Sequence, residues 1–141
     1  MQVADFLEEY ALAYSAGDIE TMADRFDLPC PIIRPEGATT IAGRSALVDF
    51  LQDQRDTYAS LGVGRIRGAN VEEVGPDDGL GLLNIRWQLY HRHGHLMTAC
   101  ASTYVLRRRD GLIRIAALVA HDELEKRALL MARHRRSDTA G

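Results

Sequence analysis

The sequence predicts an α+β fold in which helices pack on one face of a curved antiparallel sheet. Apolar residues recur with a helical period up to about Gly62 and with a period of two beyond it. The breaks between the later segments carry hairpin residues, which joins those segments into a meander. A chain of 141 residues, 46% hydrophobic and 26% charged, has the composition of one globular domain. We expect a single domain over residues 1–141, with a core at about 3–122 and a C-terminal helix at about 123–136.

Two helices are expected at the start of the chain. Apolar residues between Val3 and Tyr14 fall at i, i+3, i+4, i+7 and i+11, which is the spacing of one helix face. Gly17 suits a left-handed helix end, and Asp18 suits the cap of a second, shorter helix. The buried face of that second helix is expected to carry Ile19, Met22, Ala23 and Phe26.

Two prolines then end the helical region. Pro29 and Pro31 prevent its continuation, because proline lacks an amide donor and pushes the preceding residue toward extended geometry. Short extended segments are expected at 32–34 and 39–42, with a turn at 35–37 between them. A third helix is expected to open at Gly43–Ser45 and to stop near Gly62. Its inward stripe comprises Leu47, Phe50, Leu51, Gln54 and Tyr58.

The second half of the chain is expected to form four strands and a last helix. The strand candidates are 63–74, 80–92, 95–109 and 112–120, separated by a loop at 75–79 and by turns at His93-Gly94 and Asp110-Gly111. Asp122, followed three residues later by Glu125, has the spacing of a capping box. The last helix is therefore expected to run from Asp122 to about Arg136.

Counting outward from the two hairpin turns then predicts which residues pair across the strands and share a face of the sheet. A two-residue turn at Asp110-Gly111 pairs Arg109 with Leu112 and, further along, Cys100 with His121; a turn at His93-Gly94 pairs Arg92 with His95 and Trp87 with Cys100. One face is then mostly apolar and is the face that the helices must cover. It collects Leu83, Ile85, Trp87, Leu89, His91, Leu96, Thr98, Cys100, Ser102, Tyr104, Leu106, Ile113, Ile115, Ala117, Val119 and His121. The mixed outer face carries Arg86, Gln88, Tyr90, Thr103, Val105, Arg114, Ala116 and Leu118.

The order of elements resembles a known superfamily. Two helices, a short hairpin ending in Gly43-Arg44-Ser45, a helix, and a meander closed by Arg109-Asp110-Gly111-Leu112-Ile113 resemble the nuclear transport factor 2-like superfamily over about residues 3–122. Within it the chain looks most like the SnoaL-like and ketosteroid-isomerase-like branch. The resemblance implies a cystatin-like, cone-shaped fold with a ligand site in the cone. It also implies a homodimer through the outer sheet face, and activities that range from isomerase, cyclase, dehydratase and hydrolase to noncatalytic binding.

The predicted inner face supplies candidate site residues. His121 is the candidate acid–base group, because imidazole moves protons near neutral pH, with Tyr14 or Tyr104 as hydrogen-bond donor. The alternative is that His121 only hydrogen-bonds a helix end or Tyr14. The candidate ligand-binding residues are Trp87, Leu89, Thr98, Cys100, Ser102 and Tyr58, and core packing explains the aromatic ones equally well.

A carboxylate is missing from the predicted inner sheet surface. The steroid isomerases that the resemblance brings in use aspartates as base and donor, so this departure counts against isomerase and cyclase activity. Asp24, Asp27 and Glu36 could reach the mouth of the cone, although no spacing requires it. A thiol nucleophile at Cys100 is disfavoured, because a buried neutral cysteine is the commoner case.

Other function classes are disfavoured by composition. A net charge of −3 is too small to attract nucleic acid or an anionic membrane from afar. The histidines of His91-Arg92-His93-Gly94-His95 are separated by the turn, so three converging imidazoles are not expected, and we expect neither a metal nor a cofactor. Two cysteines and an acidic N-terminus favour a cytoplasmic location. The sequence thus predicts a protein that binds a small apolar molecule, and it leaves open whether this protein is also an acid–base enzyme. The alternative is a noncatalytic binding or dimerisation module.

Overall fold

The computed structural model describes residues 1–76 and 78–140. Asp77, within the loop predicted at 75–79, and Gly141, the last residue of the predicted domain, lie outside the described residues. The helices are α1 (Val3–Ala16), α2 (Ile19–Ala23), α3 (Arg44–Ser60) and α4 (Glu123–Ala140). The strands are β1 (Cys30–Arg34), β2 (Gly37–Ile41), β3 (Val63–Val74), β4 (Gly79–His91), β5 (Leu96–Arg109) and β6 (Leu112–Ala120).

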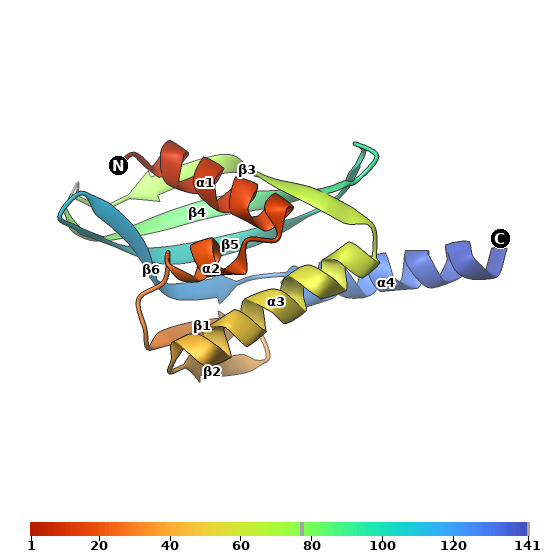
Figure 1. Ribbon diagram of the computed structural model, residues 1–141, viewed down its shortest axis with the longest axis horizontal. Helices are drawn as coiled ribbons and strands as arrows, with labels where there is room; N and C mark the ends of the chain where they lie inside the picture. The colour runs from red at the N-terminus through yellow and green to blue at the C-terminus, as the bar shows by residue number, and fades with distance from the viewer. Residues whose placement is uncertain (77, 141) are drawn as a thin grey trace.

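The strands form one open, curved sheet. Their order is β2-β1-β6-β5-β4-β3, with β1 parallel to β6 and every other neighbouring pair antiparallel. Figure 1 shows α1, α2 and α3 lying across one face of this sheet, while α4 continues from β6 and extends beyond it. The predicted α+β architecture is confirmed. No helix in residues 1–76 or 78–140 is both long and apolar enough to cross a membrane.

The helical hairpin forms as its residues predict. Gly17 ends α1 with a φ of 70°, a left-handed conformation that glycine adopts at little cost. The Asp18 carboxylate accepts the Thr21 amide at 3.2 Å and so caps α2. Tyr10 and Tyr14 are buried on the sheet-facing side of α1, which brings two phenol rings to the inner face.

The β4–β5 hairpin keeps the predicted register over the middle of the sheet. Trp87 pairs with Cys100, as expected from the turn. The predicted pairing of Arg92 with His95 is wrong, because the register shifts after Leu89 and the His91 amide donates to the His95 carbonyl at 2.8 Å. The loop therefore holds three residues between His91 and His95, and the shift is confined to the tip.

The β5–β6 hairpin departs from the predicted register where it covers the core. Its turn is as expected, with positive φ at Asp110 and Gly111 and with Arg109 opposite Leu112. Further on, Leu106 pairs with Ile115 but Val105 pairs with Ala117, so Ala116 is an extra residue and forms a bulge. A bulge reverses the alternation of side chains beyond it.

The bulge changes which residues face the helices. Ser102 pairs with Ala120, and the predicted pairing of Cys100 with His121 is wrong. Leu118 and Ala120 face the core instead of Ala117, Val119 and His121.

A change of partners on the other edge of β6 accompanies the bulge. Ile115 exchanges hydrogen bonds with the segment after α2, donating to the Arg25 carbonyl at 2.7 Å and accepting from the Asp27 amide at 2.9 Å. Two residues past the bulge, Leu118 pairs with Ile32 of β1 instead. Turn residues report only the local register, so the hairpin turn carries no signal of this change.

Candidate functional site

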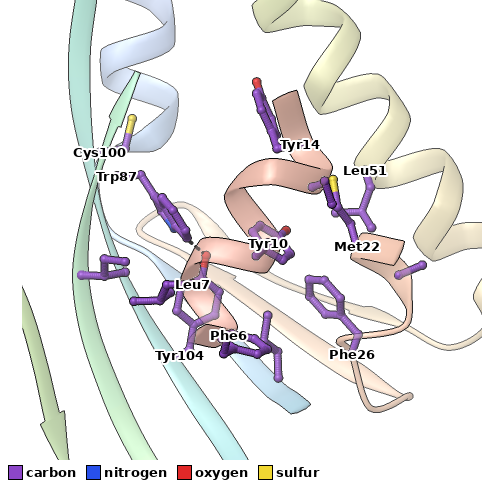
Figure 2. Packing of buried hydrophobic residues seen from close by; sticks show 14 of the residues in the cluster. Phe6, Leu7, Tyr10, Tyr14, Met22, Phe26, Leu51, Trp87, Cys100 and Tyr104 are labelled. Atoms are coloured by element: carbon purple, nitrogen blue, oxygen red, sulfur yellow. Dashed lines mark hydrogen bonds between the residues drawn. The ribbon is translucent and has the colours of Figure 1, made fainter. Parts of the chain in front are cut away.

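A cavity of about 80 Å³ lies between the inner face of the sheet and α1–α3. Figure 2 shows Trp87 and Cys100 of the sheet on one side and Tyr10 and Tyr14 of α1 on the other. The volume is well below the roughly 300–1,000 Å³ of pockets for drug-sized ligands, so the cavity suits a small molecule. It is lined by Tyr10, Tyr14, Met22, Phe26, Phe50, Leu51, Gln54, Tyr58, Ile66, Trp87, Leu89, Cys100, Ser102, Tyr104, Leu118, Ala120 and Glu123.

Glu123, the first residue of α4, places a carboxylate in the wall of this cavity. It is only 7% exposed and is the one charged side chain among the described residues that line the cavity. The Tyr58 hydroxyl donates to its Oε1 at 2.6 Å, and the Arg127 guanidinium lies 3.6 Å from the same oxygen. Its Oε2 is buried and has no hydrogen-bond partner among the residues that the structure describes. Such an oxygen is costly in an apolar cavity and marks a place for a donor.

Two phenols near Glu123 remain protonated. Burial, and then the Glu123 carboxylate, raise the pKa of Tyr58 well above its ordinary value. Burial also raises the pKa of Tyr14, although Arg55 opposes the shift. Both hydroxyls therefore keep their protons at neutral pH, and Tyr58 stabilises the carboxylate as a donor.

At the opposite wall, a buried tryptophan and a buried tyrosine are joined by a hydrogen bond. The Trp87 indole Nε1 donates to the Tyr104 hydroxyl at 2.8 Å, and burial raises the pKa of Tyr104 to about 12. The Tyr10 ring packs at a tilt against Trp87, with ring centroids 5.9 Å apart. This wall is a packed aromatic surface with its indole N–H already used.

Cys100 lies in the cavity as a protonated thiol. Burial raises its pKa to about 12, and the carboxylates of Glu123 and Asp122 add to the shift. Because the thiolate is the nucleophilic form, this thiol is unreactive at neutral pH.

His121 does not reach the cavity, so the expectation that it points into the cone is wrong. It is exposed, and its Nε2 lies 2.8 Å from the Thr103 hydroxyl oxygen on the outer face. Thr103 gives its own proton to Asn84 at 2.6 Å, so the imidazole Nε2 must be the donor to Thr103. The bulge at Ala116 is the reason that the ring lies on this side.

The remaining candidates divide into those that line the cavity and one that does not. Tyr14, Tyr104, Trp87, Leu89, Cys100, Ser102 and Tyr58 all line it. Thr98 pairs with Leu89 but is absent from the lining.

Sequence reasoning missed Glu123. The capping box drew attention to its neighbours, yet the Asp122 carboxylate accepts the Ala101 amide at 2.8 Å and so holds the start of α4 to β5. A usable signal was present: Glu123 and Leu130 are spaced i, i+7, and Leu130 is buried, which places both on the inward face of the helix.

The histidines at the β4–β5 tip do converge, contrary to expectation. The His91 ring lies 4.7 Å from the His95 ring and 4.8 Å from the His93 ring, centroid to centroid. The three-residue loop brings them together. Even so, no group of three or more His, Cys, Asp or Glu side chains in residues 1–76 and 78–140 is arranged to hold a metal ion.

Comparisons with solved structures identify the fold. The chain is 21% identical to a domain of unknown function with a cystatin-like fold from Nostoc punctiforme, with a TM-score of 0.66 over 98% of this chain and 91% of that one. It is 19% identical to Aln2 from a Streptomyces species, with a TM-score of 0.67 over 89% and 92% of the two chains. It is 18% identical to a protein of unknown function from Mycobacterium tuberculosis, with a TM-score of 0.63 over 95% and 87%.

The family assignment rests on sequence. No curated protein matches this sequence. Residues 1–123 match the family described as NTF2-like protein (DUF6841), a range that spans α1 to the start of α4. The superfamily resemblance drawn from the order of elements is thereby confirmed, and the chain belongs to this NTF2-like family.

Proposed function

We propose that this protein binds a small, largely apolar molecule in the inner cavity and that Glu123 is the acid–base group of the site. The observation that carries the proposal is the buried Oε2 of Glu123, which has no partner among the described residues in a cavity lined mostly by apolar and aromatic side chains, with Gln54 and Ser102 as uncharged polar ones. A pocket with apolar walls and few polar groups is the usual form of a small-molecule site.

The chemistry follows from the two oxygens of the carboxylate. Tyr58 occupies Oε1 as a donor, so Oε2 is the oxygen that accepts a hydrogen bond or a proton from an O–H or N–H group of the ligand. The proton moves from the ligand to Glu123 and leaves when the product takes it back, so the carboxylate is regenerated. Tyr14 is protonated and lines the same cavity, so its hydroxyl supplies a donor for a ligand oxygen.

Trp87 allows this proposal to be tested without a known substrate. It is the single tryptophan of the sequence and lines the cavity, so its fluorescence reports occupancy. A panel of small alcohols, amines and ketones should include binders that shift Trp87 emission in the wild type. Glu123→Gln should weaken the binders that donate a hydrogen bond by about tenfold or more, because a bond to a charged acceptor is lost.

A control variant gives the test its meaning. Asp53→Asn removes an equal charge from an exposed position on α3 that does not line the cavity, and it should leave the same affinities unchanged. If no member of the panel shifts Trp87 emission, or if both variants bind like the wild type, the proposed site is wrong and a noncatalytic module is favoured.

We also propose that two copies associate through the outer sheet face. Leu80 and Leu82 of β4 are more than 40% exposed, and they alternate with the buried residues of the same strand. An apolar patch on a sheet face is often covered by a partner. Sedimentation at micromolar concentration should show a dimer that Leu82→Arg dissociates, and a wild-type monomer would refute this arrangement.

A further inference from the structure

We infer that the ligand of the cavity is a small alkylammonium ion, that is, a protonated amine. The inference rests on the proposed function, since it names the substrate class of the same site. Three observations carry it: the buried Glu123 oxygen that has no hydrogen-bond partner among the described residues, the aromatic walls, and an acidic surface pocket next to them.

Among the described residues, one cation lies near the carboxylate inside the cavity, and it approaches only one of the two oxygens. Arg127 approaches only Oε1, at 3.6 Å, and Tyr58 is a neutral donor to that same oxygen. A buried charge that is only partly compensated is unfavourable, and a cation placed against Oε2 reduces that cost. A ligand carboxylate or phosphate would instead add a second negative charge in a poorly solvated space.

The walls suit a cation with a short alkyl group. Tyr10, Tyr14, Tyr58 and Trp87 all line the cavity, and Figure 2 shows the Tyr10 and Trp87 rings side by side. Aromatic faces attract ammonium groups, most strongly where water is excluded. The volume of about 80 Å³ limits the alkyl group to a few carbon atoms.

Glu123 also borders a surface pocket of about 230 Å³ on the other side of the α4 start. The other charged residues of that pocket are Glu36, Asp122, Glu125 and Arg34. Carboxylates outnumber the single guanidinium, so the pocket attracts cations toward Glu123 and repels anions.

The test compares three probes of similar shape and different charge. Isobutylammonium chloride, isobutanol and sodium isobutyrate are titrated into the protein at matched ionic strength, with Trp87 emission as the readout. Isobutylammonium should bind at least about tenfold more tightly than isobutanol, because the same hydrogen bond gains a full charge. Isobutyrate should bind more weakly than isobutanol.

Variants separate this inference from the proposed function. Glu123→Gln should abolish the preference for isobutylammonium, while isobutanol still binds, although more weakly than to the wild type. Arg127→Met, which removes the competing cation, should strengthen isobutylammonium binding. Asp53→Asn, which removes a carboxylate from an exposed position on α3 outside both pockets, should keep the wild-type order of the probes. Circular dichroism checks that each variant is folded.

The outcomes are distinct. If isobutanol binds as tightly as isobutylammonium, or if Glu123→Gln keeps the ammonium preference, the ligand class is wrong while the cavity remains a binding site. If isobutyrate binds best, Arg34 in the surface pocket is the anchor and the inference fails. If none of the three probes shifts Trp87 emission, this ligand class is wrong. The cavity is refuted as a binding site only if the wider panel of alcohols, amines and ketones also leaves Trp87 emission unchanged.

Discussion

The two polar walls of the cavity differ in how far their hydrogen bonds are completed. On β4 and β5, the Trp87 indole donates to the Tyr104 hydroxyl, and the strands keep a regular register around these two residues. At the junction of β6 and α4, next to a strand with a bulge, Glu123 has one hydrogen-bonded oxygen and one buried oxygen without a partner in the part of the chain that the structure describes. A complete pair indicates packing, whereas an incomplete one indicates a place where the protein receives a ligand.

Removing the packed wall should have the largest effect. Trp87→Ala deletes a buried indole that contacts Tyr10 and donates to Tyr104, so the free energy of unfolding should fall by about 3–5 kcal/mol. Urea denaturation followed by circular dichroism measures the loss. Trp87→Phe, which keeps most of the ring, should lose clearly less, and equal losses for the two variants would contradict the packing role.

At the wall that contains Glu123, removing Tyr58 and Glu123 together should raise the free energy of unfolding relative to removing Tyr58 alone. Tyr58→Phe deprives Glu123 of its short hydrogen bond, so the free energy of unfolding should fall by about 1–3 kcal/mol. The double variant Tyr58→Phe/Glu123→Leu should recover at least the wild-type value, because an apolar pair replaces a buried charge. A double variant less stable than Tyr58→Phe would show that the Glu123 carboxylate stabilises the fold.

A pair of neighbouring residues tests the bulge. Ala120 lines the cavity and His121 lies on the outer face, so Ala120→Val should weaken ligand binding while His121→Ala should leave it unchanged. The unfolding free energy of His121→Ala should stay within about 0.5 kcal/mol of the wild type, as for most surface changes. Trp87 emission during titration with isobutanol measures binding. If His121→Ala weakened binding and Ala120→Val did not, the register predicted from the turn would be correct instead.

The smallest effect is expected at the β4–β5 tip. Desolvation and the neighbouring His95, His93 and Arg92 lower the pKa of His91, so the unfolded chain binds more protons below the ordinary histidine pKa of about 6.5. Stability should therefore decline slightly as the pH falls below that value through the folded pKa. Thermal unfolding between pH 7.5 and 5 should show a shallower decline in His91→Gln than in the wild type, and identical slopes would refute this origin.

Most of the fold follows from the sequence because helix faces, caps and turns are local signals. The cap at Asp18, the helix end at Gly17 and the turn at Asp110-Gly111 need only neighbouring residues, and all are as predicted. The same signals place Trp87 opposite Cys100 and bring Tyr58 to the inner face.

The site follows less well because two of its determinants are not local. The bulge at Ala116 coincides with a change of partner on the far edge of β6, from the Arg25–Asp27 segment to β1, and neither is visible in the hairpin turn. A shift of one residue moved His121 outward and Ala120 inward. Glu123 then reaches the cavity from the start of a helix, where a carboxylate ordinarily indicates only a favourable helix dipole.

The open order of the sheet leaves two strands with an unpaired edge, and those edges bear on aggregation. β2 is only five residues long, which limits the backbone it offers to another chain. β3 is longer but has two register irregularities and exposes Arg65, Arg67, Glu72 and Glu73. Short length, irregular backbone and charge all oppose the edge-to-edge stacking that seeds insoluble fibres. The protein can thus leave its sheet unclosed, as a cavity under the helices requires, without exposing a template for self-propagating assembly.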